Sequence, residues 1–180
     1  MEDLVRIKMS SASADHVREE TLWAKHLGGP LFEVRSLPIF FEGINKMDVV
    51  EVGLGEEGDL PRVVGMMQSG GHRTLRILFR NTTTSSERNE INEQLRQFGV
   101  ELQEGVAGLW SIDIPQQQVQ ATVSSYLSAM RKLGRLECET DVGIPALLAQ
   151  WRQQKDKRQD GTYHSASIDD EKTARHNWFV

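Results

Sequence analysis

The succession of hydrophobic periods after His72 constrains the fold of this chain more than any other feature. Residues 72–80, HRTLRILFR, alternate polar and apolar side chains, which predicts a strand with one buried face. The segments that follow have the periods of a helix, two short strands, a second helix and a last strand. They lie at residues 84–98, 100–104, 109–114, 115–133 and 135–143. The order β-α-β-β-α-β within about 70 residues is typical of a ferredoxin-like unit.

Local signals support both expected helices. Thr84 followed by Glu87 is a capping box, and Gly99 lies where a helix favours a left-handed residue. Pro115 is suited to begin the second helix and Gly134 to end it. Apolar residues recur at helical spacing, namely Ile91, Leu95, Phe98, Val119, Val123, Leu127 and Met130. Each helix therefore has one face that can cover a sheet.

The ferredoxin-like order also predicts what the other face of the sheet carries. From the first strand it carries His72, Thr74, Arg76 and Arg80. The last strand, expected beside the first, adds Glu137, Glu139 and Asp141. The simplest interpretation of the two arginines is a salt-bridge ladder that faces solvent or an interface.

The first half of the chain is less regular. Short strands are expected near residues 4–10, 31–43, 48–54 and 62–69, separated by Gly, Pro and Asp turns. A short helix is expected from Val17 to Leu27. The fold class is therefore α+β, with a small bent β-sheet or partial barrel carrying one helix before the ferredoxin-like unit.

These sequence patterns predict that the chain has four parts. Residues 1–70 form the β-rich unit, 71–144 the βαββαβ unit and 145–157 a last helix. From residue 158 the composition becomes polar, which favours a disordered tail, although Trp178 and Phe179 are large enough to dock.

Composition excludes several functional classes. The net charge of -5 and pI near 5.6 argue against nucleic-acid binding, and no apolar run approaches the length of a membrane span. The N-terminus lacks the pattern of a signal peptide and the single cysteine, Cys138, cannot form an intrachain disulfide. We expect a cytoplasmic protein with no metal site and no cofactor.

His72 is the candidate for chemistry, because it follows Ser69, Gly70 and Gly71 where the two halves of the chain meet. It can donate to a backbone carbonyl across this junction, contact a ligand or partner, or act as a general acid or base. His72 and Thr74 form the H-x-T motif of two-histidine phosphoesterases. That mechanism needs two such motifs, and the other histidines, His16, His26, His164 and His176, provide no second copy.

Glu20 and Trp23 are three residues apart and would share a face of the expected Val17–Leu27 helix. Trp23 would anchor that helix on the sheet, with Glu20 either in solvent or turned toward His72 or an arginine. The residues expected to bind a ligand or partner are Glu20, Trp23, Ser69, His72, Thr74 and Arg76.

Short motifs also resemble those of a known family. They are E-x-x-W-A at Glu20–Ala24, LPIFF, INKMDVVEV and SGGHRTLRI. Their most distinctive residues are Glu20, Trp23, Asp48, Ser69, Gly70, Thr74 and Arg76. Over about Leu4 to Gly143 the chain resembles a bacterial family defined as a domain of unknown function. The resemblance implies no activity.

These observations favour a non-enzymatic module that binds a small molecule or a protein at the junction of the two halves and on the open face of the sheet. A homodimer is compatible with this function. The alternatives are a hydrolase or phosphoesterase that uses His72, and a toxin-neutralising partner whose acidic charge suits a basic target.

Overall fold

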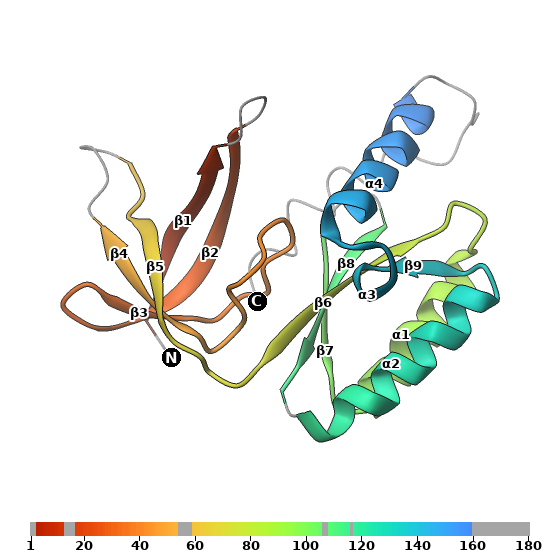
Figure 1. The fold of residues 1–180 in the computed structure, drawn as a ribbon, viewed down its shortest axis with the longest axis horizontal. Coiled ribbons are helices and arrows are strands. Elements are labelled where there is room, and N and C mark those ends of the chain that lie inside the picture. Colours follow the sequence, from red (N-terminus) through yellow and green to blue (C-terminus); the bar gives the residue numbers. More distant parts are fainter. Residues whose placement is uncertain (1–2, 13–16, 54–58, 106–107, 116, 160–180) are drawn as a thin grey trace.

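The computed structural model describes residues 3–12, 17–53, 59–105, 108–115 and 117–159, and it contains two separate sheets joined by the chain between β5 and β6 (Figure 1). The strands are β1 (Leu4–Ala12), β2 (Val17–Gly28), β3 (Leu31–Val34), β4 (Val49–Gly53), β5 (Arg62–Gln68), β6 (Arg73–Phe79), β7 (Glu101–Glu104), β8 (Leu109–Ile114) and β9 (Leu136–Cys138). The helices are α1 (Ser85–Gln97), α2 (Gln117–Lys132), α3 (Glu139–Val142) and α4 (Ile144–Gln159).

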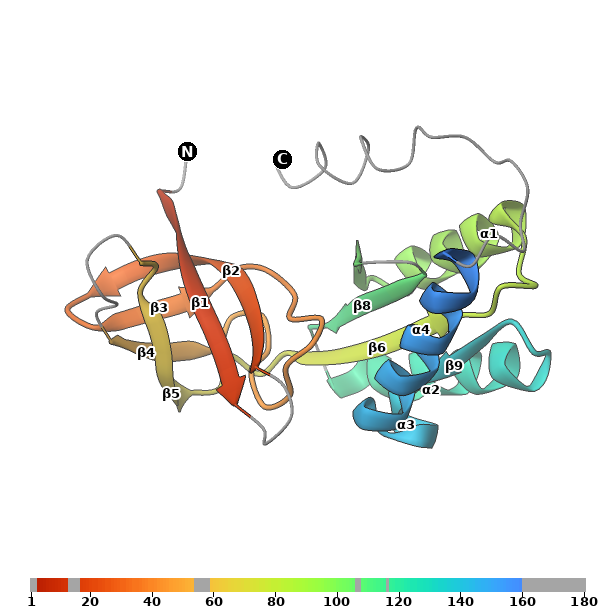
Figure 2. The ribbon, with the colours of Figure 1, turned by 90° about the horizontal axis from the view of Figure 1, so that it is seen from above.

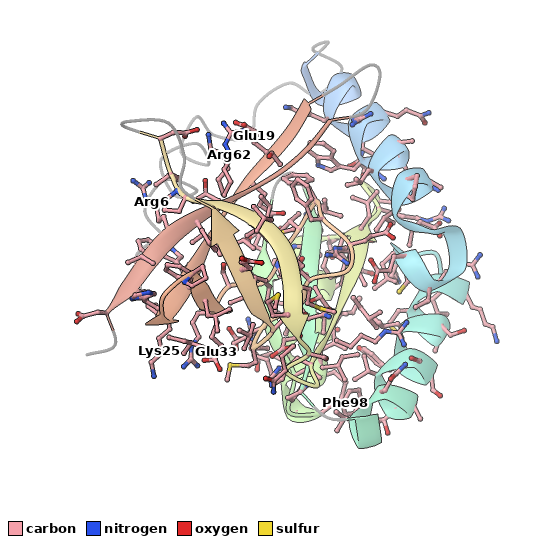
Figure 3. The ribbon with its side chains drawn as sticks, turned by 60° about the vertical axis from the view of Figure 1, so that its left-hand side comes forward. Arg6, Glu19, Lys25, Glu33, Arg62 and Phe98 are labelled. Atoms are coloured by element: carbon pink, nitrogen blue, oxygen red, sulfur yellow. The ribbon has the colours of Figure 1, made fainter. Side chains whose placement is uncertain are left out.

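The first five strands form a closed barrel in chain order. β1 closes the barrel by pairing parallel to β5, at Lys8 and Arg62. Asp59 reinforces this closure, because it lies 2.9 Å from the Lys8 ammonium and 2.7 Å from the Arg62 guanidinium. Figure 3 shows this end of the barrel near Glu19 and Arg62. The barrel core contains Ile7, Met9, Leu22, Ala24, Val34, Phe41, Ile44, Val50 and Val52.

The helix predicted from Val17 to Leu27 is wrong, because this segment is strand β2. It pairs along its length with β1 in an antiparallel hairpin. Leu22 and Ala24 are buried in the barrel, whereas Thr21 is exposed, and this is the alternation of a strand. Glu, Leu, Ala and Lys favour helices in isolation, but pairing with a neighbouring strand overrides that weak preference.

The second sheet has the strand order β7-β8-β6-β9, with every neighbouring pair antiparallel. Its elements follow the predicted order of strand, helix, two strands, helix and strand. Helices α1 and α2 pack on one face (Figure 2), where Leu75, Ile77 and Phe79 meet Leu95 and Leu127. The predicted capping box is confirmed, since Thr84 and Glu87 each accept a hydrogen bond from the other's backbone N–H.

Two expectations about this sheet are wrong. The last strand ends at Cys138, and Glu139–Val142 form the short helix α3 instead of continuing it. The face opposite α1 and α2, expected to be open, is covered, because Leu78 packs with Ile39, Leu147 and Leu148. The final helix α4 extends to Gln159, and the remainder of the expected tail, 160–180, lies outside the described residues.

Candidate functional site

A long loop connects the barrel to the covered face of the second sheet. This loop, residues 35–48, leaves β3 and returns to β4, and we call it the seam loop. Leu37, Pro38 and Ile39 are all buried although they form no strand. Buried backbone groups need hydrogen-bond partners, and side chains from both halves of the molecule supply them here.

Arg76 on β6 holds the carbonyl side of the seam loop. Its Nε donates to the Ile39 oxygen at 3.1 Å and its Nη2 to the Pro38 oxygen at 3.2 Å, with a further hydrogen bond to the Phe41 oxygen. Its Nη1 lies 3.2 Å from Glu139 Oε2. Arg76 is only 3% exposed, so the prediction that it faces solvent is wrong. The alternative prediction is that it faces an interface, and in the structure that interface is with the seam loop of the same chain.

Arg80 and Glu137 form the second rung of the predicted ladder. Their side chains make an ion pair, and the Arg80 side chain is about half exposed. Arg131 also approaches Glu137, at 3.4 Å. This end of the sheet therefore agrees with the predicted salt bridges and lies outside the seam.

Glu20 on β2 holds the N–H side of the seam loop. Its two carboxylate oxygens accept hydrogen bonds from the backbone N–H groups of Ile39 at 2.7 Å and Phe40 at 3.0 Å. Burial raises the pKa of Glu20, while these hydrogen bonds and the charge of Arg76 act in the opposite direction. Glu20 thus points into the seam, where it bonds to the loop and is influenced by the charge of Arg76.

Asp48 fixes the other end of the seam loop to the chain entering β6. Fully buried, it accepts hydrogen bonds from the N–H of Asn45 at 2.7 Å and of Gly70 at 2.8 Å. Asn45 in turn accepts from the N–H of Thr74 at 2.9 Å. A Cβ atom on Gly70 would overlap the Met47 carbonyl, so this close approach requires glycine.

His72 and Asp113 form the other polar pair of the seam. Nδ1 of His72 lies 2.9 and 3.0 Å from the two carboxylate oxygens of Asp113 on β8. The Asp113 side chain is 4% exposed and the His72 side chain 20% exposed. Burial raises the pKa of Asp113, and the hydrogen bond from His72 opposes this shift. The predicted backbone carbonyl partner of His72 is therefore replaced by a carboxylate.

Further polar groups surround this pair. The Lys46 ammonium forms an ion pair with Glu101 and lies 4.0 Å from Asp113 Oδ2. Thr74 lies directly opposite Asp113 in the ladder of β6 and β8, and its hydroxyl is buried without a hydrogen-bond partner among the described residues. Groups from β6, β7, β8 and the seam loop thus converge around His72.

The remaining predicted site residues do not join this cluster. Trp23 and Glu20 lie three apart on a strand, so their side chains point to opposite faces and the predicted shared face is wrong. The backbone of Trp23 bonds to the start of the seam loop, through Ser36 Oγ and the N–H of Arg35. Ser69 is exposed and accepts a hydrogen bond from the N–H of Gly71 at 3.2 Å.

Asp113 and Lys46 are site residues that the sequence prediction missed. The alternation of LWSIDI directs Trp110, Ile112 and Ile114 toward the helices, which leaves Asp113 on the face of His72. The ferredoxin-like strand order would then have placed Asp113 beside the first strand. Lys46 carries no comparable signal, because it lies in a loop.

Metal-binding clusters and membrane-spanning helices are both absent from the described part of the chain. It contains no group of three or more His, Cys, Asp or Glu side chains arranged to hold a metal ion. Within the same residues, no helix has the length and apolar character needed to cross a membrane.

The fold and site define a class of α+β protein in which a five-stranded barrel is joined to a four-stranded sheet by a buried, side-chain-clamped loop. The chain belongs to the family described as Domain of unknown function (DUF4265), whose model matches residues 20–138. The resemblance inferred from the short motifs to an uncharacterised family is thereby confirmed.

A solved structure with a similar fold is titled "Novel crystal structure of a hypothetical protein from Neisseria gonorrhoeae". It matches 77% of this chain and 94% of its own chain, with a TM-score of 0.63 and 11% identity. At this identity the likeness concerns the fold alone. A search of curated proteins found no match.

Proposed function

We propose that the chain is a non-enzymatic, cytoplasmic ligand-binding or protein-interaction module whose binding surface surrounds His72. The observation that carries the proposal is an imidazole oriented by a buried carboxylate and still partly open to solvent. Glu20 and Arg76 bond to the seam loop instead. Among the predicted binding residues, His72 therefore best combines a fixed orientation with access.

The chemistry of the pair indicates how a ligand would be bound. An ionised carboxylate only accepts hydrogen bonds, so with Asp113 ionised Nδ1 of His72 is the donor of this hydrogen bond. The other ring nitrogen, Nε2, is then the atom offered to a ligand or partner. The half-buried Lys46, which lies 4.0 Å from Asp113 Oδ2, is on the neighbouring seam loop and suits a polar ligand.

The strand order supports a finer description of the scaffold. We infer that β6 to β9 with α1 and α2 are a ferredoxin-like unit, since the sheet order is β7-β8-β6-β9 with both helices on one face. Such units often serve as binding or dimerising modules. This support is an analogy from fold, so the residues around His72 carry the proposal.

Replacement of His72 by Gln tests the proposal, with His26→Gln as matched control. His26 is an exposed barrel histidine whose Nε2 lies 2.9 Å from the Gly29 oxygen. Ligands are first identified by thermal-shift screening of inorganic phosphate, carboxylates, nucleotides and sugars, and protein partners by affinity capture followed by purification. His72→Gln should weaken the identified complex about tenfold or more, because a hydrogen bond is lost from a partly desolvated site.

One outcome of this experiment would contradict a binding surface around His72. Equal affinity in wild type and His72→Gln would show that the binding surface lies elsewhere. Arg76→Ala is unsuitable for this test, because Arg76 is buried against the seam loop and its loss disturbs the fold.

A hydrolase is the second candidate, and the same His72–Asp113 pair favours it. A histidine held by a carboxylate is the arrangement of a general base with its orienting group. In this function Nε2 removes a proton from water while the water oxygen attacks the phosphorus of a phosphoester. The ester P–O bond breaks, and the leaving oxygen receives the proton that Nε2 removed.

Turnover separates the two functions. If His72 is the base, His72→Gln should reduce phosphoester hydrolysis by roughly 10² to 10⁴, whereas His26→Gln should retain it. The purified wild type is first tested for hydrolysis of a panel of phosphoesters. Failure to hydrolyse any of them would reject the hydrolase function.

A further inference from the structure

Strand β5 presents three large apolar side chains to solvent on its way from the barrel to β6. Val64 is 63% exposed, Met66 50% and Met67 59%, and we call these residues the β5 ridge. Met66 and Met67 are adjacent, and two consecutive exposed apolar residues interrupt the normal alternation of side chains along a barrel strand. The ridge contains none of the residues of the His72 site.

The exposure of Met67 beside Met66 accompanies irregular pairing within β5. Val49 pairs with Gln68 and Val50 with Met66, so Met67 is an extra residue on β5. Glu51 pairs with Gly65 and Val52 with Val63, which makes Val64 a second extra residue. Bulges redirect side chains and are features that a fold retains for a reason. Val64 and Met66 are exposed as ordinary alternation places them, and the extra residue Met67 adds an exposed apolar neighbour.

The size of the ridge limits what can occupy it. A stable complex between separate proteins needs roughly 800 Å² from each partner, which three side chains cannot supply. A segment of the same chain needs far less contact, because tethering gives an effective concentration of the order of millimolar. The ridge is therefore matched to a short tethered segment.

The chain contains a segment with the required chemistry. Residues 176–180, HNWFV, carry Trp178 and Phe179, and each aromatic side chain can bury roughly 150–250 Å². Methionine sulfur makes favourable contacts with aromatic rings, which suits Met66 and Met67.

The chain between α4 and residues 176–180 is long enough for this segment to reach the β5 ridge. Residues 160–175 separate the end of α4 from this segment, and an extended chain of that length reaches about 50 Å. A compact chain of 180 residues has a radius of gyration of roughly 16 Å, so this reach spans the molecule.

We propose that residues 176–180 bind the β5 ridge of the same chain through Trp178 and Phe179. The segment then acts as an intramolecular cover for an apolar surface. This proposal is independent of any ligand at His72.

Methyl NMR on the full-length chain labelled at the methionine methyl groups tests the contact. The Met66 and Met67 signals, assigned with single Met→Leu variants, should shift between wild type and the Trp178→Ser/Phe179→Ser variant, because ring currents are lost. Leu133→Gln, which changes a 66% exposed side chain outside the ridge, is the matched control and should leave both signals in place.

A reciprocal measurement uses the ridge itself. In Met66→Gln/Met67→Gln the backbone amides of residues 178 and 179 should exchange with solvent about fivefold faster or more than in wild type, because their protection is lost. Identical Met66 and Met67 signals with and without Trp178 and Phe179 would overturn the proposal. Shifts that disappear on dilution would also overturn it, since they would indicate binding to a second copy.

Discussion

At the scale of single residues, Arg76 contributes to the fold by donating to backbone oxygens and pairing with Glu139 in a buried site. Replacing it with Met should destabilise the protein by about 3–5 kcal/mol, because the carbonyl partners and the Glu139 carboxylate lose their counterpart. Urea unfolding of wild type and variant measures the difference.

Arg80 provides the matched control for this substitution. It also pairs with a glutamate, Glu137, but its side chain is 48% exposed, so Arg80→Met should cost no more than about 1 kcal/mol. Adding Glu139→Gln to Arg76→Met should cost less than the sum of the single effects, since the residues share one interaction. A loss below about 1 kcal/mol for Arg76→Met would contradict the clamp.

The raised pKa of Glu20 predicts that the stability of the protein depends on pH. Burial raises its folded pKa above the ordinary value of 4.5, so the unfolded state ionises first as the pH increases. The contribution of Glu20 to stability is therefore fully present below pH 4.5 and is lost as the pH rises through the folded pKa. Glu20→Gln has no such loss, and its stability relative to wild type should increase with pH.

Denaturant unfolding at several pH values from 4 to 7 would measure this difference. Glu90→Gln, a change at an exposed position of α1, controls for the loss of one negative charge. A stability difference between Glu20→Gln and wild type that stays constant over this range would show that Glu20 is not the titrating group.

At the scale of elements, helix α1 is anchored by Leu95. This side chain is fully buried between the helix and the sheet, together with Ile77 and Ile112. Leu95→Ala should destabilise by about 2–5 kcal/mol, from lost burial and the cavity left behind. Leu133→Ala, at a 66% exposed position, should change stability by less than about 0.5 kcal/mol. Similar denaturation midpoints for both variants would contradict the core.

The second sheet was more accessible to sequence analysis than the barrel, for physical reasons. Its helices have complete local signals, such as the Thr84 capping box, and the apolar residues that β6 turns toward the helices alternate in the sequence. The barrel strands bury their residues through non-local pairing, which local patterns do not record. The Val17–Leu27 segment shows this, because only its partner β1 determines that it is a strand.

The candidate site was predictable in part. Arg76 and Glu139 were expected to be neighbours from the strand order, and they are in contact. The binding of Glu20 and Arg76 to the seam loop was not predictable, because the loop has no periodicity and its position depends on both halves of the chain.

At the scale of the whole molecule, the seam couples the barrel to the second sheet. Glu20 belongs to the barrel and Arg76 to the second sheet, and both bond to the seam loop around Ile39. We expect wild type to unfold in one transition, with equal calorimetric and van't Hoff enthalpies. Arg76→Met should separate this into two transitions. Two resolved transitions in wild type would contradict the coupling.

The parallel closure of the barrel has a consequence for the order of events during synthesis. Asp59 follows Lys8 by 51 positions, so the barrel cannot close before that length has been synthesised, and Glu139 follows Arg76 by 63 positions. Because translation adds residues from the N-terminus, a closed barrel can exist on the ribosome while the guanidinium of Arg76 still lacks its carboxylate. Completion of the seam is therefore a late step of biogenesis.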